Sequence, residues 1–443
     1  AGAVGLAAGG EYRRETYTDF RDAESGRLSA ADVQRLGLRP SLIGDNNFLQ
    51  VSPSDNTDAR RDVTAAFAEL SVPLHRNDRS PGFRTLTFSA AARFERTSDF
   101  GRTTKPKVGL AARVLPWATV RASVNETFRA PNLASLFSGA VQRSITGVSD
   151  AYRAAVTGSS DDGASARRVS LRAGNPALMP EKARTLSAGL ALAPRAINGL
   201  SLTIDWWQIA QTDALTRLDA ADILAQDTAL LHAASATSPS TPIAQVNLSA
   251  AGSPNVQRRE VTPADRAAFA AYNAGRPRSE QRAAVGAIGA IAESYLNASR
   301  RDLAGFDFVV GYRPAPTVVG AFHAMLEAAY LLQYDETLDR ASPRTDLSWR
   351  DGNTRWKGSF TLSWSHRDWS AAIFSTYTGR TQDAFLRTST QTGRSVSPDG
   401  FLIVESSWLT NLSVTRQFNG TGLLARTSVR LAVTNVFDAE PPF

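Results

Sequence analysis

The sequence predicts an all-β fold, an antiparallel transmembrane β-barrel, from three observations. Apolar and polar residues alternate with a period of two in about thirteen segments, the pattern of strands with two unlike faces. These segments run for about 10–15 residues, whereas soluble strands are commonly about 5–6 residues long and a tilted membrane strand needs about 9–11. The connections alternate between long and short, which favours a barrel with loops on one rim and turns on the other.

Length and hydropathy are compatible with this fold and exclude several others. The chain has 443 residues, well above the roughly 150 of one ordinary domain, and no segment recurs at a fixed period, which excludes solenoids and periodic propellers. The mean hydropathy is −0.22, and no apolar run approaches the roughly 18–20 residues of a spanning helix. A helical membrane protein is therefore excluded, whereas alternating barrel strands keep an ordinary hydropathy.

The strands are predicted one by one from their alternation. It is clearest in 84–96, where Phe88 and Phe94 share one face and Arg93 lies on the other. The same pattern predicts strands at 107–115, 118–128, 184–193, 200–208, 306–312, 356–364, 408–414 and 429–433. Four further segments fit less cleanly and have the same interpretation: 4–17, 62–74, 318–334 and 369–379.

The connections give the barrel its polarity. The short ones are 75–83, 116–117, 195–198, 314–317, 367–368 and 419–423. The long ones are 18–61, 129–180 and 213–300, and the stretch 97–106 is of medium length. Two stretches of the largest loop, 215–234 and 264–273, have a helical pattern and are expected to form short helices there.

The two faces of each strand are expected to meet different surroundings. Apolar residues should contact lipid, and Arg, Asn, Ser and Thr should line the lumen. This places Leu412 and Val433 against lipid and Thr434 in the lumen. Aromatic residues near strand ends fit a girdle at the membrane surface, although they could also be core aromatics of a soluble β protein: Trp206, Trp207, Trp356, Trp369, Tyr377 and Trp408.

Charge and reactive residues argue against other functions. The net charge is +7, but the basic residues are scattered, so no nucleic-acid partner is expected. There is no cysteine, and His75, His232, His323 and His366 are far apart, so neither a metal site nor another cofactor is expected. No catalytic or phosphate-binding motif occurs, and the chain is predicted not to be an enzyme.

Five segments, in order along the chain, resemble TonB-dependent receptors. FRAPNLASLF at 128–137 and NPALMPEKA at 175–183 are similar to the family's FRAPSLxELF and NPxLxPExS segments. Residues 199–209, 304–308 and 434–438 resemble its GLSLTVDYYxI, GxD and NLFD segments. We interpret the signature residues as structural, marking where loops begin, and not as a ligand site: Phe128, Arg129, Ala130, Pro131, Asn175, Pro176, Leu178, Pro180, Glu181, Asn435, Phe437 and Asp438.

The resemblance implies an architecture and a transport function. The family has a barrel of about 22 strands plugged by a separate N-terminal domain. Residues 1–443 are then expected to be part of the barrel domain, without the plug and truncated at both ends. The receptor would lie in the outer membrane of a Gram-negative bacterium, in contact with outer-membrane lipid. The TonB–ExbB–ExbD complex would supply the energy for uptake.

The ligand and two rival functions stay open at this stage. A ferric siderophore, a vitamin, an oligosaccharide or a peptide could be the nutrient, and the long loops are expected to contact it. One rival is a passive porin-like channel, which shares the strand and loop statistics. The other is a soluble all-β protein that binds or hydrolyses carbohydrate.

Overall fold

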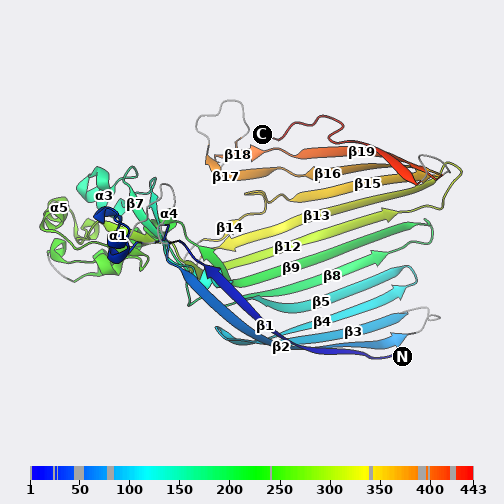
Figure 1. Cartoon of the computed structure of the whole chain (residues 1–443), viewed down its shortest axis with the longest axis horizontal. Coiled ribbons are helices and arrows are strands. Elements are labelled where there is room, and N and C mark those ends of the chain that lie inside the picture. The colour runs from blue at the N-terminus through cyan, green and yellow to red at the C-terminus, as the bar shows by residue number, and fades with distance from the viewer. Residues whose placement is uncertain are drawn as a thin grey trace.

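The computed structural model describes residues 2–22, 25–26, 28–43, 54–76, 84–239, 242–338, 343–387, 396–397, 400–419 and 426–442. One large antiparallel sheet dominates it, and a smaller unit of helices and short strands lies beyond one end of the strands (Figure 1). No helix among these residues is long and apolar enough to cross a bilayer.

The large sheet follows chain order. Thirteen strands pair in succession in the described residues, in agreement with the predicted number. They are β1 (Gly5–Asp19), β2 (Thr57–Arg76), β3 (Thr85–Thr97), β4 (Gly101–Leu115), β5 (Ala118–Arg129), β8 (Glu181–Leu192), β9 (Leu200–Arg217), β12 (Tyr295–Tyr312), β13 (Ala321–Thr337), β15 (Trp356–His366), β16 (Trp369–Thr378), β19 (Ser407–Phe418) and β20 (Thr427–Val433). A fourteenth, β14 (Thr345–Asp346), pairs with the end of β13.

The register aligns the predicted apolar residues into one continuous face. Residues directly opposite each other in antiparallel strands point to the same side of the sheet. Ile204 lies opposite Leu190 on one neighbouring strand and Phe308 on the other. Leu412 likewise lies opposite Val433, so the two share a face as predicted. We call this side of the sheet the outer face and the opposite, polar side the inner face.

One assignment of a side chain to a face was wrong, and a second one is left untested. Trp207 lies opposite Ser187 and Gly305, which puts it on the inner face and outside any girdle. Both Trp206 and Trp207 also lie well inside β9, because this strand continues to Arg217. Thr434 lies beyond the end of β20, so strand phase does not assign it to the lumen.

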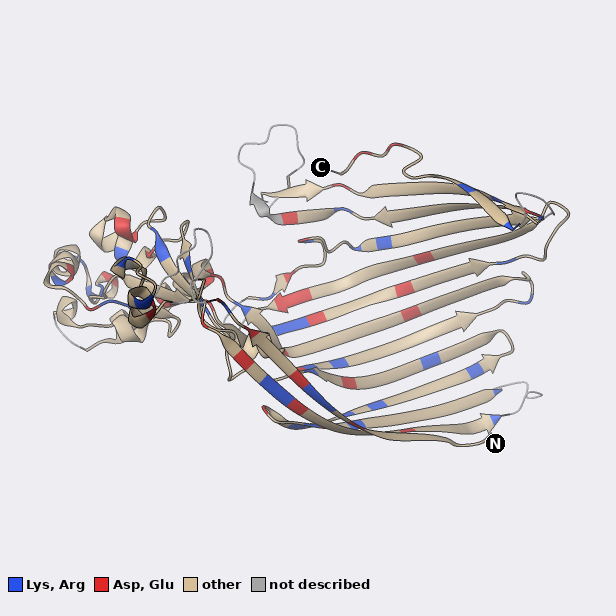
Figure 2. Ribbon diagram, in the orientation of Figure 1, with Lys and Arg blue, Asp and Glu red and all other residues tan. Residues whose placement is uncertain are grey.

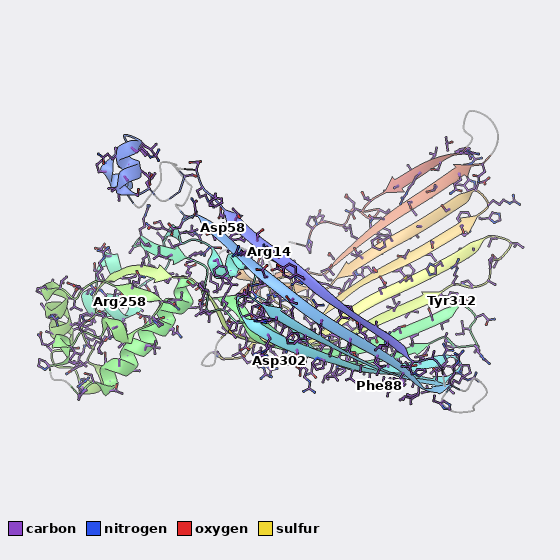
Figure 3. The ribbon with its side chains drawn as sticks, turned by 60° about the horizontal axis from the view of Figure 1, so that its bottom comes forward. Arg14, Asp58, Phe88, Arg258, Asp302 and Tyr312 are labelled. Atoms are coloured by element: carbon purple, nitrogen blue, oxygen red, sulfur yellow. The ribbon has the colours of Figure 1, made fainter. Side chains whose placement is uncertain are left out.

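The connections alternate between the two rims as predicted. Short connections lie at the right in Figure 1, whereas the long connections lie at the left, together with one tight turn between β3 and β4; we call these the turn rim and the loop rim. Figure 3 shows Phe88 and Tyr312 toward the turn rim and Arg14 and Asp58 toward the loop rim. The predicted alternation of strand connections is therefore a property of the folded sheet.

One connection was predicted wrongly. The medium loop expected at 97–106 is a turn of only three residues, and β4 begins at Gly101. Pro106 suggested a loop because proline donates no ladder hydrogen bond. It is accommodated because the pairing of β4 with β5 stops at Lys107, so Pro106 has no partner on that side.

The ends of β9 and β12 were also misjudged. Residues 215–217, predicted as helix, continue β9, and Leu215 lies opposite Asn297 of β12. The helix begins only at Ala220, where the side chain of Asp219 accepts the backbone N–H of Asp222 and caps it. A strong local cap therefore separates strand from helix where hydrophobic spacing alone does not.

The smaller unit is built from two of the long loops. Its helices are α3 (Ala151–Thr157), α4 (Ala220–Thr237) and α5 (Pro263–Asn273), of which α5 matches the prediction closely. Four short strands form a second sheet in the order β10-β11-β7-β6: β6 (Val141–Ile145), β7 (Arg168–Arg172), β10 (Val256–Arg258) and β11 (Ile288–Ala292). We call residues 141–172 and 218–293 the loop unit.

The other connections carry little regular structure. α1 (Ala30–Arg35) lies in the first long loop, and α2 (Leu133–Phe137) follows β5. β17 (Thr381–Arg387) and β18 (Phe401–Val404) form a hairpin beyond β16 and β19. The short 3₁₀ turns are Pro40–Leu42, Ser160–Asp162, Ile243–Gln245, Ser249–Ala251 and Arg278–Glu280.

The loop unit has its own hydrophobic core. One cluster gathers around Ile223, Leu224 and Ile291, and a second around Tyr152 and Phe269. Both clusters join side chains from the two loops, which are separated by β8 and β9 in the sequence. The expected surface loops with short helices are therefore one folded body.

Candidate functional site

Two signature segments meet at the loop rim. Arg129, the last residue of β5, forms an ion pair with Glu181, the first residue of β8. The buried Glu181 carboxylate also accepts the backbone N–H of Leu215 at 2.6 Å, which fastens β8 to the far end of β9. Phe128 packs edge-to-face on Phe100 with ring centroids 6.3 Å apart. These contacts hold the strand ends together where the loops begin.

The rest of the first segment directs the chain away from β5. The Pro131 carbonyl accepts a hydrogen bond of 2.7 Å from Arg61, and Ala130 lines the same groove as Arg61. Asn132 then caps α2, since its side chain accepts the backbone N–H of Ser135 at 2.6 Å. A proline followed by a capping residue thus turns the chain from strand to helix within a few residues.

The second segment brings the chain back to β8. The Asn175 side chain donates to the Tyr295 carbonyl at 2.8 Å, which ties the end of one long loop to the start of β12. Leu178 and Pro180 are buried, whereas Pro176 is exposed. These contacts are structural in character, and the assigned role of the segment stays a prediction.

The last of the five segments, residues 434–438, lies away from these two. Asn435 and Asp438 have positive φ angles of 51° and 49°, and the Asn435 side chain both donates to and accepts from the backbone of Ala439. The Asn435 backbone N–H donates to Asn411 of β19, and Phe437 is 77% exposed. Five strands (β9, β12, β13, β15 and β16) separate β19 from β8, so the signature residues form two groups.

A ladder of opposite charges covers the inner face of β1–β3. Arg13 contacts Glu11 at 2.9 Å and Glu15 at 2.8 Å, and it lies 3.6 Å from Glu95. Arg93 contacts the same Glu11 and Glu95 at 2.9 and 3.0 Å. Figure 2 shows these signs alternating along β1 and β2 toward the loop rim. Each arginine therefore links β1 to β3. We call the inner face of these strands the wall.

Arg61 connects this ladder to the loop rim. Its buried guanidinium lies 2.6 Å from Asp99 and 3.4 Å from Glu15, and it stacks 5.3 Å from the ring centroid of Phe100. Together with its bond to Pro131, these contacts engage all three nitrogens of the guanidinium. Arg61 therefore links the wall to the loop that follows β5.

A groove of about 830 Å³ runs over this wall. Arg129 and Pro131 lie at its rim end, and Lys105 and Lys107 of β4 and Asn125 of β5 lie farther along it. Lys105 is 3.6 Å from Glu126. Both charge signs and several hydrogen-bonding groups face one open channel, so the groove can hold a polar or charged solute without burying it.

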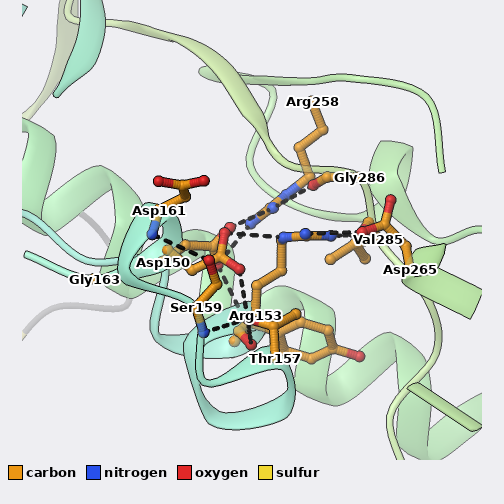
Figure 4. A network of polar contacts seen from close by, with 12 residues as sticks. Asp150, Arg153, Thr157, Ser159, Asp161, Gly163, Arg258, Asp265, Val285 and Gly286 are labelled. Atoms are coloured by element: carbon orange, nitrogen blue, oxygen red, sulfur yellow. Dashed lines mark hydrogen bonds and ion pairs between the residues drawn. The ribbon is translucent and has the colours of Figure 1, made fainter. Parts of the chain in front are cut away.

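The loop unit is held by a network of buried charges (Figure 4). Arg258 lies 2.7 Å from Asp150 and 2.6 Å from Asp227, and all three side chains are 1% exposed. Arg258 also donates to the Gly286 carbonyl at 2.9 Å. Asp150 comes from the first loop, and Asp227 and Arg258 come from the second. The network therefore joins the two loops.

A second arginine repeats this arrangement. Arg153 donates to Asp162 at 3.1 Å, to Asp265 at 2.8 Å and to the Val285 carbonyl at 2.5 Å. Next to it, the Tyr152 hydroxyl shares a hydrogen bond of 2.6 Å with Ser235. Buried charges of this kind require both partners, because a lone buried charge is costly.

Burial and these partners shift several pKa values in the loops. Burial raises the pKa of the Tyr152 phenol, and it lowers the pKa of the His232 imidazole together with the nearby charge of Arg282. For Asp265, burial alone would raise the pKa, but hydrogen bonds from Thr262 and Arg153 outweigh it and lower the pKa of that carboxyl. Outside the loop unit, hydrogen bonds from Ser29 lower the pKa of Asp32 to about 2.

Sequence reasoning missed the loop unit's charged network. The spacing of Asp150 and Arg153 carries one local signal, since Asp150 caps α3 by accepting the Arg153 backbone N–H. No spacing links Asp150 to Arg258, 108 residues away. No group of three or more His, Cys, Asp or Glu side chains in the described part of the chain could hold a metal ion.

Comparison with known proteins identifies the family. The family model described as "TonB dependent receptor-like, beta-barrel" matches residues 2–436, so the chain belongs to this family. Its members are outer-membrane transport receptors of Gram-negative bacteria and not enzymes, and the resemblance, the fold class and the non-enzymatic assignment are confirmed. No curated protein sequence matches the chain.

Solved structures share the fold. A point mutant of the ferric enterobactin receptor PfeA from Pseudomonas aeruginosa, in complex with enterobactin, is 14% identical with a TM-score of 0.56, over 98% of this chain and 46% of that one. The siderophore receptor PirA from Acinetobacter baumannii is 13% identical with a TM-score of 0.57, over 99% and 50%. The chain thus spans about half the length of the receptors it matches, and at this identity the likeness establishes the fold alone.

Proposed function

We propose that the chain supplies the barrel wall and the ligand-capturing loops of an outer-membrane receptor for a ferric siderophore. In this proposal the loop unit binds the ligand at the cell surface, and the inner face lines the conduit. A plug domain would close the lumen, and the TonB–ExbB–ExbD complex would supply the energy. PfeA is a ferric enterobactin receptor and PirA a siderophore receptor, and the likeness to them favours an iron chelate among the nutrients.

One observation carries the proposal. The loop unit stands at the loop rim, where the charged groove of the inner face also begins at Arg129 and Pro131. A rigid body of loops at the mouth of a polar groove suits capture followed by transfer along the wall. A passive porin has no need of a folded loop body with a hydrophobic core of its own.

Energy dependence tests the proposal. The full-length gene is expressed in a siderophore-receptor-deficient Gram-negative host under iron limitation, and uptake of a ⁵⁵Fe-siderophore is measured. We expect uptake that disappears when tonB is deleted. Uptake that persists without TonB would support the passive channel. A product that fractionates as a soluble protein would support the carbohydrate-binding alternative.

A loop deletion tests the assignment of capture to the loop unit. Arg217 and Tyr295 lie opposite each other in the ladder, so a short Gly-Ser linker can replace residues 219–292 and leave β9 and β12 paired. We expect this variant to reach the outer membrane and keep its heat-dependent gel mobility, but to lose siderophore binding. Unchanged binding would assign capture to another part of the receptor.

A further inference from the structure

A small groove opens on the outer face of the sheet, just below the loop rim. It encloses about 430 Å³ above the ends of β15 and β16 and the start of β19. Two arginines, three aromatic rings and one hydroxyl line it: Arg355, Arg380, Trp349, Trp356, Tyr377 and Ser406. We propose that this groove binds the phosphate-bearing headgroup of a membrane lipid in the leaflet at the loop rim.

The aromatic floor of the groove belongs to the lipid-facing side of the sheet. Trp356 lies opposite Tyr330 with ring centroids 4.6 Å apart, and Tyr330 lies opposite Phe306 of the apolar face. Tyr377 lies opposite Trp408, with centroids 4.8 Å apart. Trp356 and Trp408 are 44% and 59% exposed. Such rings sit at the membrane–water boundary, where they pack on upper acyl chains.

Two arginines line the same groove as these rings. Arg380 lies 5.9 Å from the ring centroid of Trp349, and it has no carboxylate partner among the residues that the structure describes. Arg355 donates to the Leu332 carbonyl at 3.2 Å and lies 3.7 Å from Asp346, which leaves donors of its guanidinium unused. Guanidinium groups bind phosphate oxygens through paired, charge-assisted hydrogen bonds.

The combination of charge and aromatic floor selects the occupant. A soluble anion would use the arginines but leave the exposed rings without a partner. A phosphate-bearing lipid satisfies both, with its phosphate on Arg355 and Arg380 and its chains on Trp356 and Tyr377. The Ser406 hydroxyl adds a further donor at the headgroup level.

The turn rim provides a matched control. Arg416 also lies on the outer face, opposite Trp369, but its guanidinium stacks 5.1 Å from the Trp369 ring and 4.8 Å from the Phe418 ring. Its two ring partners belong to β16 and β19, and Arg416 is not among the residues that line the proposed lipid groove. An Arg416→Gln variant therefore removes a cation from the outer face without touching the proposed site.

Lipid binding by the purified full-length receptor tests the proposal, which rests on the membrane placement proposed above but not on the nutrient. Diphosphoryl lipid A is added to the receptor in detergent, and bound lipid is counted by native mass spectrometry. We expect wild type and Arg416→Gln to retain the lipid alike. The Arg355→Gln/Arg380→Gln pair should weaken retention by at least about tenfold, because each charged hydrogen bond contributes well over a factor of ten.

Other outcomes would overturn the proposal. Equal retention by the double variant and wild type excludes these arginines. Equal retention of a phosphate-free glycolipid excludes phosphate recognition. Displacement of the lipid by inorganic phosphate at low millimolar concentration would assign the groove to a free anion. The single variant Arg380→Gln controls for misfolding, because Arg380 is exposed and its replacement should leave the fold intact. It should by itself weaken lipid retention. The double variant should still take up the ⁵⁵Fe-siderophore, so failure of the lipid site and failure of the proposed transport function give different results.

Discussion

The large sheet and the loop unit bury their apolar residues in opposite ways. On the outer face of the sheet, Val429 and Leu431 are 61% and 69% exposed, whereas Phe269 and Ile291 in the loop unit are fully buried. The sheet therefore needs lipid to cover its apolar face, while the loop unit covers its own. The two regions should respond differently to changes in their side chains and in the solvent.

The largest effect is expected from the buried arginine of the loop unit. Arg258→Met leaves Asp150 and Asp227 as unpaired buried charges, which should cost about 3–5 kcal/mol. Hydrogen exchange should show α4 and β11 losing protection while β15 and β16 keep theirs. The control is Arg276→Ala, an exposed cation beside Glu280 and the Tyr272 ring, for which the cost should stay near or below about 1 kcal/mol. Equal losses in the two variants would contradict the network's role.

The next effect distinguishes the two faces of the sheet. Leu412→Arg places a charge on the outer face and should cost about 2–4 kcal/mol at mid-membrane. Ser413→Arg, on the neighbouring residue of the inner face, should cost much less. Urea titration of the receptor folded into liposomes measures both values. If the costs were the same, the assignment of the faces would be wrong.

A smaller effect is expected from a single hydroxyl of the loop unit. Tyr152→Phe keeps the ring in its cluster but leaves the Ala283 carbonyl without this donor and the Ser235 hydroxyl without this hydrogen-bond partner. The loss should be about 1–2 kcal/mol in the opening free energy of the loop unit, again measured by hydrogen exchange. Tyr377→Phe on the outer face is the control and should leave that free energy unchanged.

The smallest effect is a pH dependence confined to the loop unit. Burial lowers the folded-state pKa of His232 below its ordinary value of 6.5, so the unfolded loops bind the proton more readily. Stability should therefore decline as the pH falls through about 6.5 and level off below the folded-state pKa. His232→Gln should abolish the decline. A decline of the same size in that variant would assign the dependence to another group.

The sheet could be predicted from the sequence because its pattern is local. Every predicted strand is present, since alternation such as that of Phe88 and Arg93 depends only on neighbouring residues and on an apolar medium outside the sheet. Errors came where a local signal has two meanings. Pro106 reads as a loop residue, yet it is tolerated where pairing with β5 has ended.

The loop unit could not be predicted in the same way. Its core joins Tyr152 to Phe269, and its charges join Asp150 to Arg258, in each case over more than a hundred residues of chain. Such pairings depend on the sheet, which places the ends of both loops side by side at one rim. The signature residues Arg129 and Glu181 were identified from the sequence, but their ion pair became visible only in the fold.

The division of the sheet into a lipid face and a lumen face is the central claim, and the cysteine-free chain allows a direct measurement. Single cysteines at Phe360, Thr361, Leu362 and Ser363 of the full-length receptor are spin-labelled in liposomes, and their collision rates with dissolved oxygen are measured. We predict high rates at 360 and 362 and low rates at 361 and 363, because oxygen concentrates in lipid. Uniform rates along β15, or the opposite phase, would contradict the account.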